Sequence, residues 1–401
     1  MSEKELSTRL IHTGDGQDYR KLSSYQSVPE VLPVYLTSVF SFNDVPSLDD
    51  IYEGKSEGYV YTRMRHPNTD AVGRILAAAE DGEEGLVFSS GMAAIVTSIL
   101  SQVGAGDHVV ASPILYGGVR DFLEHELPRL GASVTFVDFV HGDVEAVIQK
   151  NTKLIYTETL SNPLLEVPDI QKIAGIAHSH GLPLFIDNTF ATSVVAQPLH
   201  FGADLVLYSA TKYLGGHSDI VGGAAIGSKA LIEAVRKKQS LYGPILDPWS
   251  SWLLARSLRT LDLRVRKHSE NALKVAEFLE KHPNVEKVYY PGLPTSPDHE
   301  RAAAQFRHGL FGGMLSFNLK GGEKEAAQFI KILPTIKFVP SLAGTATTLS
   351  YAVKTSHRAY TRKDLDEAGI TYGQIRLSVG LEDAEDIIRE LGEALGKLDR
   401  I

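Results

Sequence analysis

The sequence contains no cysteine among its 401 residues. Disulfide bonds and thiolate metal sites are therefore excluded, and a reducing cytoplasm is the default compartment for such a chain. The 14 histidines are scattered, and the pair His178 and His180 lacks the spacing that places two ligands on one helix face. We therefore expect no metal site.

A basic tract and a long apolar run are missing as well. The formal net charge is −9, which disfavours nucleic acid as a partner. No apolar run approaches the roughly 18 residues of a membrane span, and residues 1–6 lack the apolar core of a signal peptide. We expect a globular enzyme that has no contact with a membrane. Its length suggests two domains, or one large domain with an extension.

Short apolar segments in the middle of the chain alternate with helical patterns. The predicted strands lie at residues 86–88, 108–112, 133–138, 153–157, 183–187, 204–208 and 223–227. This alternation is typical of an α/β fold with a mostly parallel sheet that is covered on both faces. In open sheets of this kind, ligands bind beyond the carboxyl ends of the strands.

An aspartate and a lysine lie at two of these strand ends. Asp187 ends one predicted strand, and Lys212 follows the strand at 204–208 after Ser209 and Thr211. Burial there would lower the pKa of the lysine and provide an amine for Schiff-base chemistry. A lysine for the aldehyde and a carboxylate for the pyridinium nitrogen are what pyridoxal 5'-phosphate requires, and the two hydroxyls suit its phosphate. The alternative for the lysine alone is a solvated surface side chain.

Two more segments carry groups that suit a phosphate. Residues 89–95 open a helix with small side chains, which exposes backbone N–H groups. The alternative is an ordinary helix capped by serine. In a predicted strand at 59–63, Tyr61 and Arg63 point to the same side and have the donors to grip a phosphate. The alternative is a surface strand with an exposed arginine.

Tyr116 and Asn162 also follow predicted strands. The ring of Tyr116 suits stacking on a flat cofactor, whereas a half-buried loop tyrosine is the alternative. Asn162 follows Glu158 after the strand at 153–157, although Asn-Pro is also a turn signal.

The C-terminal part is predicted to be a smaller α/β domain. Residues 252–283 read as one long helix near a domain boundary, which separates a large domain at 61–255 from a small domain at 256–401. The predicted strands lie at 285–289, 314–319, 337–339 and 374–379, and the helices at 324–333 and 384–398. Arg376 lies among apolar neighbours, so we expect it to hold a carboxylate of the protein or of a substrate. Ser341 lies at another strand end.

Residues 1–60 lack a regular pattern of helices and strands. The segment 31–40 carries too many large apolar groups for a free tail. We therefore expect residues 1–60 to be an arm that packs on a neighbouring subunit. A helix is predicted next at 71–80, with Asn68 or Thr69 as its cap.

Together these segments resemble the Cys/Met-metabolism family of PLP-dependent enzymes, also called the transsulfuration family. The matching motifs are Y-T-R at 61–63, S-S-G-M at 89–92, L-Y-G-G at 115–118, E-T-L-S-N-P at 158–163, D-N-T-F at 187–190, S-A-T-K-Y-L-G-G-H-S-D at 209–219 and R-L-S-V-G-L-E at 376–382. The match covers nearly the whole chain. It implies the aspartate-aminotransferase-like fold, fold type I, with pyridoxal 5'-phosphate as cofactor.

The resemblance also implies roles for individual residues. Lys212 would form the Schiff base and act as general base, Asp187 would hold the ring nitrogen protonated, and Tyr116 would stack on the ring and protonate the leaving group. The implied phosphate ligands are Gly91, Met92, Ser209 and Thr211, with Tyr61 and Arg63 from a neighbouring subunit. The implied carboxylate ligands are Arg376, Ser341 and Asn162. The implied assembly is a tetramer of two catalytic dimers.

Several positions bear on the choice of substrate. Pro340 stands where γ-enzymes that handle cystathionine commonly carry a Glu before the serine, Gly118 stands where methionine γ-lyases commonly carry a Cys, and Ala346 replaces the Glu of the family's usual motif. Residues 17–30 resemble an insertion near the arm. The missing Glu at 340 favours a C–S lyase that acts on methionine or a related thioether and yields a 2-oxo acid, ammonia and a thiol.

Three alternatives to this lyase stay open. One is a γ-replacement enzyme of the cystathionine γ-synthase or O-acetylhomoserine sulfhydrylase type. Another is a cystathionine γ- or β-lyase. The third is a catalytically silent PLP-binding homologue.

Overall fold

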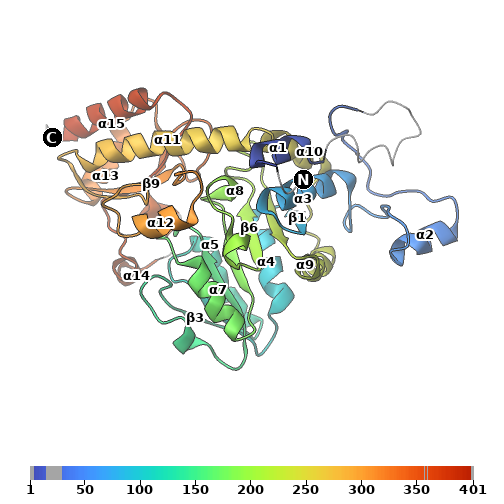
Figure 1. Ribbon diagram of the computed structural model, residues 1–401. Coiled ribbons are helices and arrows are strands. Elements are labelled where there is room, and N and C mark those ends of the chain that lie inside the picture. The colour runs from blue at the N-terminus through green and yellow to red at the C-terminus, as the bar shows by residue number, and fades with distance from the viewer. Residues whose placement is uncertain (1–3, 15–28, 356, 359, 399–401) are drawn as a thin grey trace.

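The computed structural model describes residues 4–14, 29–355, 357–358 and 360–398 (Figure 1). In this part of the chain the larger of two sheets has seven strands. Their order is β1 (Glu84–Phe88), β7 (Gly223–Gly227), β6 (Leu205–Ser209), β5 (Leu184–Asp187), β4 (Thr152–Glu158), β2 (His108–Ala111) and β3 (Ser133–Phe136). Among the described strands of this sheet, β7 runs opposite to all the others. The carboxyl ends of β1, β2, β4, β5 and β6 therefore meet at one edge, and the predicted mostly parallel sheet is confirmed.

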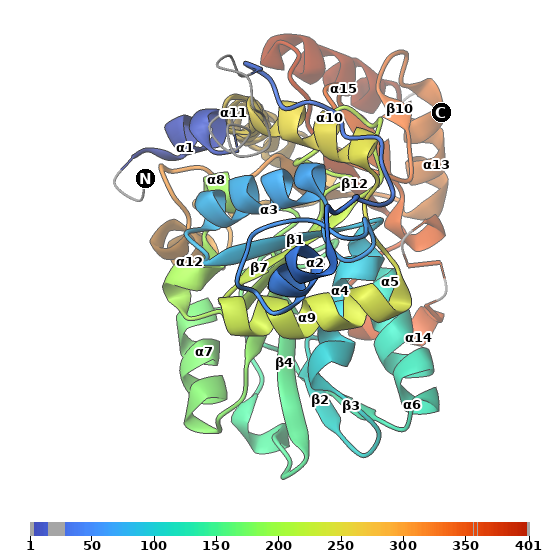
Figure 2. The same cartoon turned by 90° about the vertical axis from the view of Figure 1, so that its right-hand side faces the viewer.

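Apolar side chains on both faces of this sheet explain why the strands read as short apolar runs. In β6, Leu205 and Leu207 pack in the cluster that contains α4 (Gly91–Gln102) and α9 (Lys229–Tyr242). Val206 and Tyr208 point the other way and pack in the cluster that contains α3 (Pro67–Glu80). Figure 2 shows α3 and α9 on opposite sides of β1 and β7. Both faces are thus removed from water, as in other sheets built from parallel strands.

The second sheet lies at the other end of the long helix α11 (Leu261–Glu280) (Figure 1). In the described part of the chain it has five strands, in the order β10 (Lys337–Phe338), β11 (Thr348–Ser350), β12 (Gln374–Ser378), β9 (Met314–Leu319) and β8 (Val285–Tyr289). Its pairs are antiparallel except β10 with β11. The helices α13 (Glu323–Ile332) and α15 (Ala384–Leu398) belong to the same region. The strand β11 was not predicted, because three residues are too few to show a period.

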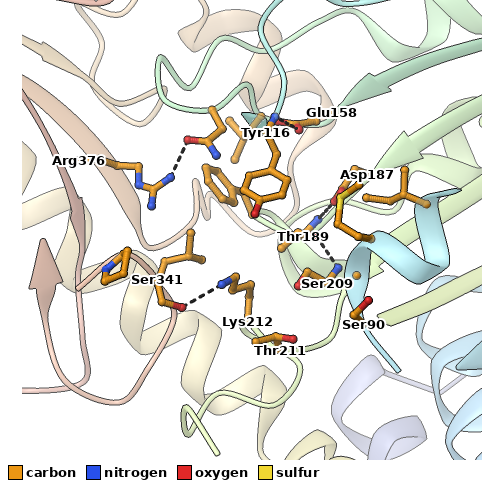
Figure 3. A pocket seen from close by; sticks show the side chains of 18 of the residues that line it. Ser90, Tyr116, Glu158, Asp187, Thr189, Ser209, Thr211, Lys212, Ser341 and Arg376 are labelled. Atoms are coloured by element: carbon orange, nitrogen blue, oxygen red, sulfur yellow. Dashed lines mark hydrogen bonds between the residues drawn. The ribbon is translucent and has the colours of Figure 1, made fainter. Parts of the chain in front are cut away.

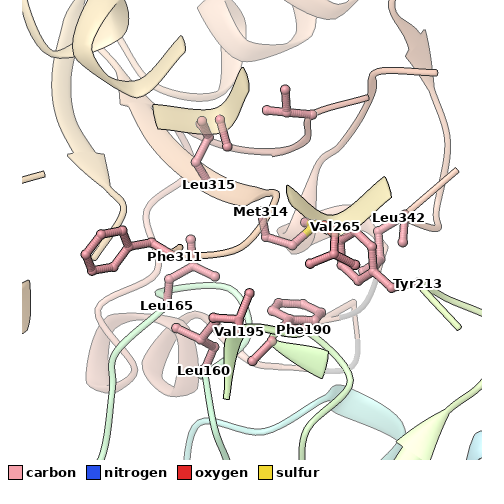
Figure 4. Packing of buried hydrophobic residues seen from close by; sticks show 14 of the residues in the cluster. Leu160, Leu165, Phe190, Val195, Tyr213, Val265, Phe311, Met314, Leu315 and Leu342 are labelled. Carbon is pink, nitrogen blue, oxygen red and sulfur yellow. The ribbon is translucent and has the colours of Figure 1, made fainter. Parts of the chain in front are cut away.

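One continuous apolar cluster joins the two regions. Figure 4 shows Leu160, Phe190 and Val195 from the larger sheet's side facing Met314 and Leu342 from the smaller one. A shared core of this kind fixes the relative position of the two sheets, because neither apolar face could be exposed to water without cost. Any cavity between the sheets therefore has firm walls.

The long helix predicted at 252–283 is wrong in one respect, because two helices occupy the segment. The first, α10 (Pro248–Leu258), begins after Asp247, whose carboxylate caps it. The second is α11. Between them, the carbonyl of Ser257 accepts hydrogen bonds from the Thr260 N–H and from the Arg264 side chain. The hydrogen bond from Thr260 to Ser257 spans three residues, so the i to i+4 pattern of α10 ends here and the chain turns.

The N-terminal region combines a packed helix with an exposed segment. The helix α1 (Leu6–His12) buries Leu6 and Leu10 in the main core, so this part of the predicted arm lies on its own chain. Residues 29–40 lack a regular helix or strand, and the side chains of Val31, Leu36 and Val39 within this segment are exposed. Residues 17–28 of the predicted insertion lie outside the described residues. Packing of the arm on a neighbouring subunit remains a prediction.

Two local predictions near residue 60 are wrong. Tyr61 forms a single bridge with Val39 and a turn follows, so no strand forms at 59–63. The helix α3 begins at Pro67 and is capped by the Nδ1 atom of His66, not by Asn68 or Thr69. Proline at the first helical position has no N–H to satisfy, which favours this earlier start.

None of the described helices is both long and apolar enough to cross a bilayer.

Candidate active site

A cavity of about 410 Å³ lies between the two sheets, at the carboxyl edge of the larger one. Figure 3 shows Lys212, Asp187 and Tyr116 pointing into it opposite Ser341 and Arg376. The predicted site residues that line it are Gly91, Met92, Tyr116, Asn162, Asp187, Ser209, Thr211, Lys212, Ser341 and Arg376. Residues more than 280 positions apart in the chain, such as Gly91 and Arg376, thus share one cavity.

Lys212 lies in the turn that follows β6. Its Nζ atom donates a hydrogen bond of 2.9 Å to the hydroxyl of Ser341. Burial lowers the pKa of Lys212, and the nearby positive charge of Arg376 lowers it further. A neutral amine is the form that attacks an aldehyde or accepts a proton, so this position suits both kinds of chemistry.

Asp187 ends β5 beside Glu158, the residue that pairs with it at the end of β4. The Thr189 N–H donates to the Asp187 carboxylate at 2.9 Å, yet burial raises the pKa of Asp187 to about 6. Burial and the adjacent Asp187 also raise the pKa of Glu158 well above its usual range. A cation placed beside Asp187, such as a protonated ring nitrogen, would stabilise its ionised form.

The start of α4 approaches the end of β6 closely. A Cβ atom on Gly91 would lie 2.7 Å from the Cβ of Ser209, so only glycine allows this approach. The first N–H groups of a helix have no intrahelical acceptor and attract anions. The hydroxyls of Ser209 and Thr211 line the same part of the cavity, and that of Thr211 also exchanges hydrogen bonds with the Gly222 backbone. These groups form a cradle that fits a phosphate.

Arg376 occupies the opposite wall, within β12. It is 4% exposed, and its Nη1 atom donates a hydrogen bond of 2.7 Å to the side-chain oxygen of Asn162. Burial lowers the pKa of Arg376 to about 10. Among the described residues no carboxylate forms an ion pair with it, so the alternative of a structural acid partner is not found. The guanidinium is therefore placed to bind a carboxylate that enters the cavity.

Tyr116 stands at the mouth of the cavity, with 45% of its surface exposed. Its backbone N–H donates to Glu158 at 2.7 Å, which holds the start of α5 (Gly117–Asp121) against β4. A Cβ atom on Gly118 would lie 2.8 Å from the ring of Tyr116. The glycine at 118, where methionine γ-lyases commonly carry a Cys, thus leaves room for the ring in its present place.

Tyr61 and Arg63 do not line this cavity. Arg63 lies 5.5 Å from the ring centre of Tyr61 and hydrogen-bonds the carbonyl of Ser240, and both side chains are exposed. A single chain therefore does not bring these two residues to Lys212.

Sequence reasoning missed Thr189 and gave Glu158 no role. The Thr189 hydroxyl accepts a hydrogen bond of 2.8 Å from the Ser209 N–H, so it ties the end of β5 to the end of β6. Its place two residues after Asp187 was the available signal. For Glu158 the signal was a carboxylate at a predicted strand end, the same signal that identified Asp187.

These features fit pyridoxal 5'-phosphate at each of its reactive groups. The lysine suits the aldehyde, the buried carboxylate suits the ring nitrogen, and the cradle at Gly91 and Ser209 suits the phosphate. The fold and the site therefore define a PLP-dependent enzyme of fold type I.

Comparison with known families is more specific. The sequence model described as "Cys/Met metabolism PLP-dependent enzyme" matches residues 7–396, and the chain belongs to this family. The predictions of family, fold and cofactor are confirmed.

Individual relatives differ in their named activities. The chain is 40% identical over 409 residues to an L-methionine gamma-lyase from Treponema denticola, covering 99% of this chain and all of the relative. It is 44% identical over 344 residues to a cystathionine gamma-lyase from Bacillus subtilis, covering 85% and 90%. A solved cystathionine gamma synthase from Xanthomonas oryzae pv. oryzae has a TM-score of 0.91 and 34% identity, with 99% of each chain covered.

Proposed function

We propose that this chain is a C–S lyase that removes the γ-substituent of methionine or a related thioether amino acid. One water is consumed, and the products are a 2-oxo acid, ammonia and a thiol. The observation that carries the proposal is the cavity that joins the Lys212 amine to Arg376, a buried guanidinium that forms no ion pair with any described carboxylate. Relatives named L-methionine gamma-lyase, with identities of 37–41%, support the choice of substrate.

Each group at the cavity has a task in this reaction. Arg376, with Ser341 and Asn162 beside it, binds the amino-acid carboxylate and so orients the substrate. The Lys212 amine removes the proton from Cα and, in a later step, removes a proton from Cβ. The bound pyridoxal phosphate supplies an electron sink for the negative charge at Cα. Asp187 holds the proton on the cofactor's ring nitrogen, which strengthens that sink.

Proton transfer to the leaving group is assigned to Tyr116. Its ring lies at the mouth of the cavity, and its hydroxyl can protonate the departing thiolate. The cradle of Gly91, Met92, Ser209 and Thr211 binds the phosphate and fixes the ring in place.

The side chains that line the cavity around Ser341 and Arg376 support a simple thioether as the substrate. Leu160, Phe190, Pro340 and Leu342 are apolar, and the acids among the described lining residues are Glu158 and Asp187 at the strand ends of the larger sheet. The distal ammonium group of cystathionine would meet no carboxylate next to Ser341. An ion removed from water without a partner costs several kcal/mol. Methionine carries no such group.

A second candidate is a cystathionine γ-lyase. The 44% identity to the Bacillus subtilis enzyme of that name favours it, and it exceeds the identity to the relatives named methionine gamma-lyase that are cited above. Both candidates use the same cofactor and the same γ-elimination, so they differ only in how the distal part of the substrate is accepted.

The assembly is part of the proposal. Tyr61 and Arg63 would reach the phosphate of a neighbouring subunit, within a tetramer of two catalytic dimers. Exposed Leu36, Val39 and Trp249 support an interface, since large apolar side chains on a surface mark contact sites. Domains at 61–255 and 256–401, the arm at 1–60 and a cytoplasmic location also remain predictions.

The test is to give the PLP-loaded protein L-methionine and to quantify 2-oxobutanoate and methanethiol together. The proposal predicts both products in equal amounts, and neither from the Lys212→Ala variant. Formation of neither product, while cystathionine yields 2-oxobutanoate and cysteine, would replace the first candidate with the second. Failure with both substrates would refute the lyase function.

A further inference from the structure

Helix α11 presents a buried polar face toward the active site. Arg264, His268 and Asn271 are 6%, 0% and 1% exposed. They follow one another at intervals of four and three residues, which places them on the same side of the helix. Buried polar groups must be matched by partners, so the question is what these three side chains hold.

Arg264 holds the turn that carries Lys212. Its Nη1 atom donates a hydrogen bond of 2.8 Å to the carbonyl of Tyr213, the residue after the lysine. Its Nη2 atom donates to the carbonyl of Ser257 at 2.9 Å, and its Nε atom to the hydroxyl of Thr260 at 3.2 Å. No carboxylate among the described residues forms an ion pair with Arg264. Burial of a guanidinium among neutral acceptors costs free energy, which indicates that Arg264 has a specific structural role at this position.

The turn itself is shaped to receive this guanidinium. Gly216 has φ +70°, and its N–H closes the turn on the carbonyl of Lys212 at 2.7 Å. A Cβ atom on Gly216 would lie 1.9 Å from Nη1 of Arg264. No side chain fits there unless the arginine moves. The glycine and the arginine therefore depend on each other.

The same face of α11 also binds residues 379–382, which follow the strand that contains Arg376. The Nδ1 atom of His268 lies 2.6 Å from the carbonyl oxygen of Val379, and Asn271 donates to the carbonyls of Gly380 and Glu382 at 3.0 and 2.7 Å. The ring of His268 also meets the ring of Tyr213 edge to face at 5.3 Å. One rigid helix thus contacts both the lysine turn and the exit of β12.

We propose that Arg264 is a positioning residue that fixes the turn of Lys212 relative to the strand of Arg376, with α11 as the common support. The proposal rests on the site assigned above to these two residues. It requires no turnover for its test, because the position of the turn can be followed in the protein itself.

The experiment compares Arg264→Met, Gly216→Ala and the double variant with the wild-type chain. Two quantities are measured: the dissociation constant of PLP, by titration of the apoprotein, and backbone amide exchange in residues 212–216 of the apoprotein. Each single variant is expected to raise the PLP dissociation constant and the exchange rate on the order of tenfold, because charge-assisted hydrogen bonds to the turn are lost. The PLP dissociation constant of the double variant is expected to be no higher than that of the single variant with the larger effect, because both changes break the same contact.

Two matched controls separate this effect from general damage. Arg266→Met removes an arginine from the same helix whose ion pair with Asp262 is partly exposed. Gly181→Ala introduces the same backbone strain at φ +67° in open space. Neither control is expected to change PLP binding or exchange in residues 212–216. Arg264→Lys, which can reach one carbonyl in place of several groups, is expected to fall between wild type and Arg264→Met, and it serves if the methionine variant does not fold.

Three results would overturn the proposal: a PLP dissociation constant within twofold of wild type in the Arg264 variants, faster exchange spread evenly over β5 and β6, or full additivity in the double variant. Failure of the wild-type protein to cleave methionine would refute the proposed function but would leave these two measurements intact. The two failures are therefore distinguishable.

Discussion

The seven-stranded and the five-stranded sheet contribute to the cavity in different ways. On the first side, Asp187 ends its strand, and Gly91 and Lys212 lie just beyond strand ends at the same edge. On the second side, Arg376 lies inside an antiparallel strand, between Ser350 and Ser316 of the neighbouring strands. The first arrangement follows from the direction of parallel strands. The second depends on one buried charge, for which Asn162 is the hydrogen-bond partner.

This difference assigns the cofactor chemistry to the side of the seven-stranded sheet and the choice of substrate to the side of the five-stranded sheet. We call the part of the cavity beside the seven-stranded sheet the cofactor end, and the part beside the five-stranded sheet the substrate end. The cofactor end contains every residue that the family's motifs predict there for a single chain. The departures at Pro340 and Ala346 lie in the segment 339–347, which connects β10 to β11 within the five-stranded sheet. The segment touches the cofactor end at one point, where Ser341 accepts the hydrogen bond from Lys212. The following predictions test whether the two ends are as separable as this view requires.

The largest effect is expected at the cofactor end. Lys212→Ala should reduce the rate at least about 1,000-fold, because the nucleophile and general base is lost. Borohydride treatment of the PLP-loaded variant should give no covalent adduct by mass spectrometry. Lys229→Ala, at an exposed position, is the control and should keep the adduct. A normal adduct in the Lys212 variant would refute the assignment.

At the substrate end, Arg376→Leu should weaken amino-acid binding by about 10- to 100-fold, as expected for loss of a charge-assisted hydrogen bond. The PLP dissociation constant should change much less. Both can be measured by spectral titration. Arg389→Leu, which breaks an exposed ion pair with Asp386, is the control. Equal losses of cofactor and substrate binding would show that Arg376 supports the whole site and that the two ends are not separable.

A smaller effect, about tenfold weaker PLP binding, is expected for Arg63→Ala if this side chain reaches the phosphate of another subunit. Mixing this variant with Lys212→Ala chains should restore part of the activity, because mixed dimers contain one site with both residues intact. Activity assays on verified mixed oligomers provide the measurement. Lack of any recovery would place Arg63 outside the site.

The smallest predicted effect concerns how the free energy of unfolding depends on pH through the buried Glu80. Glu80 is buried, accepts hydrogen bonds from Tyr208 and Asn188, and has its pKa raised by burial to about 8. Its usual pKa is 4.5, so the folded state binds this proton more tightly than the unfolded state. The contribution to stability is complete below pH 4.5 and is lost as the pH rises through about 8.

Glu80→Gln should remove this pH dependence while it keeps the acceptor oxygen. Its free energy of unfolding should exceed that of wild type by on the order of 1–3 kcal/mol at pH 9 and by much less at pH 5. Urea denaturation at the two pH values measures this, with the exposed Glu126→Gln as control. A difference that is independent of pH would contradict the raised pKa.

Much of the cofactor end could be predicted from the sequence, because strand direction and residue chemistry coincide there. A short apolar run such as 205–208 predicts a strand, and the fold type then places Lys212 beside Asp187. The helix break at Thr260 could not be predicted, because neither glycine nor proline marks it in the sequence. Thr189 was missed because its role requires the neighbouring strand. The role predicted for Tyr61 and Arg63 requires a second subunit, so it stays a prediction.

The most direct test of the account compares kcat/KM for L-methionine and L-cystathionine in one PLP-loaded preparation. We expect methionine to be preferred by at least about tenfold, because none of the described residues next to Ser341 offers a carboxylate to the distal ammonium group of cystathionine. A preference for cystathionine would contradict it and would show that the change to Pro340 does not determine the substrate.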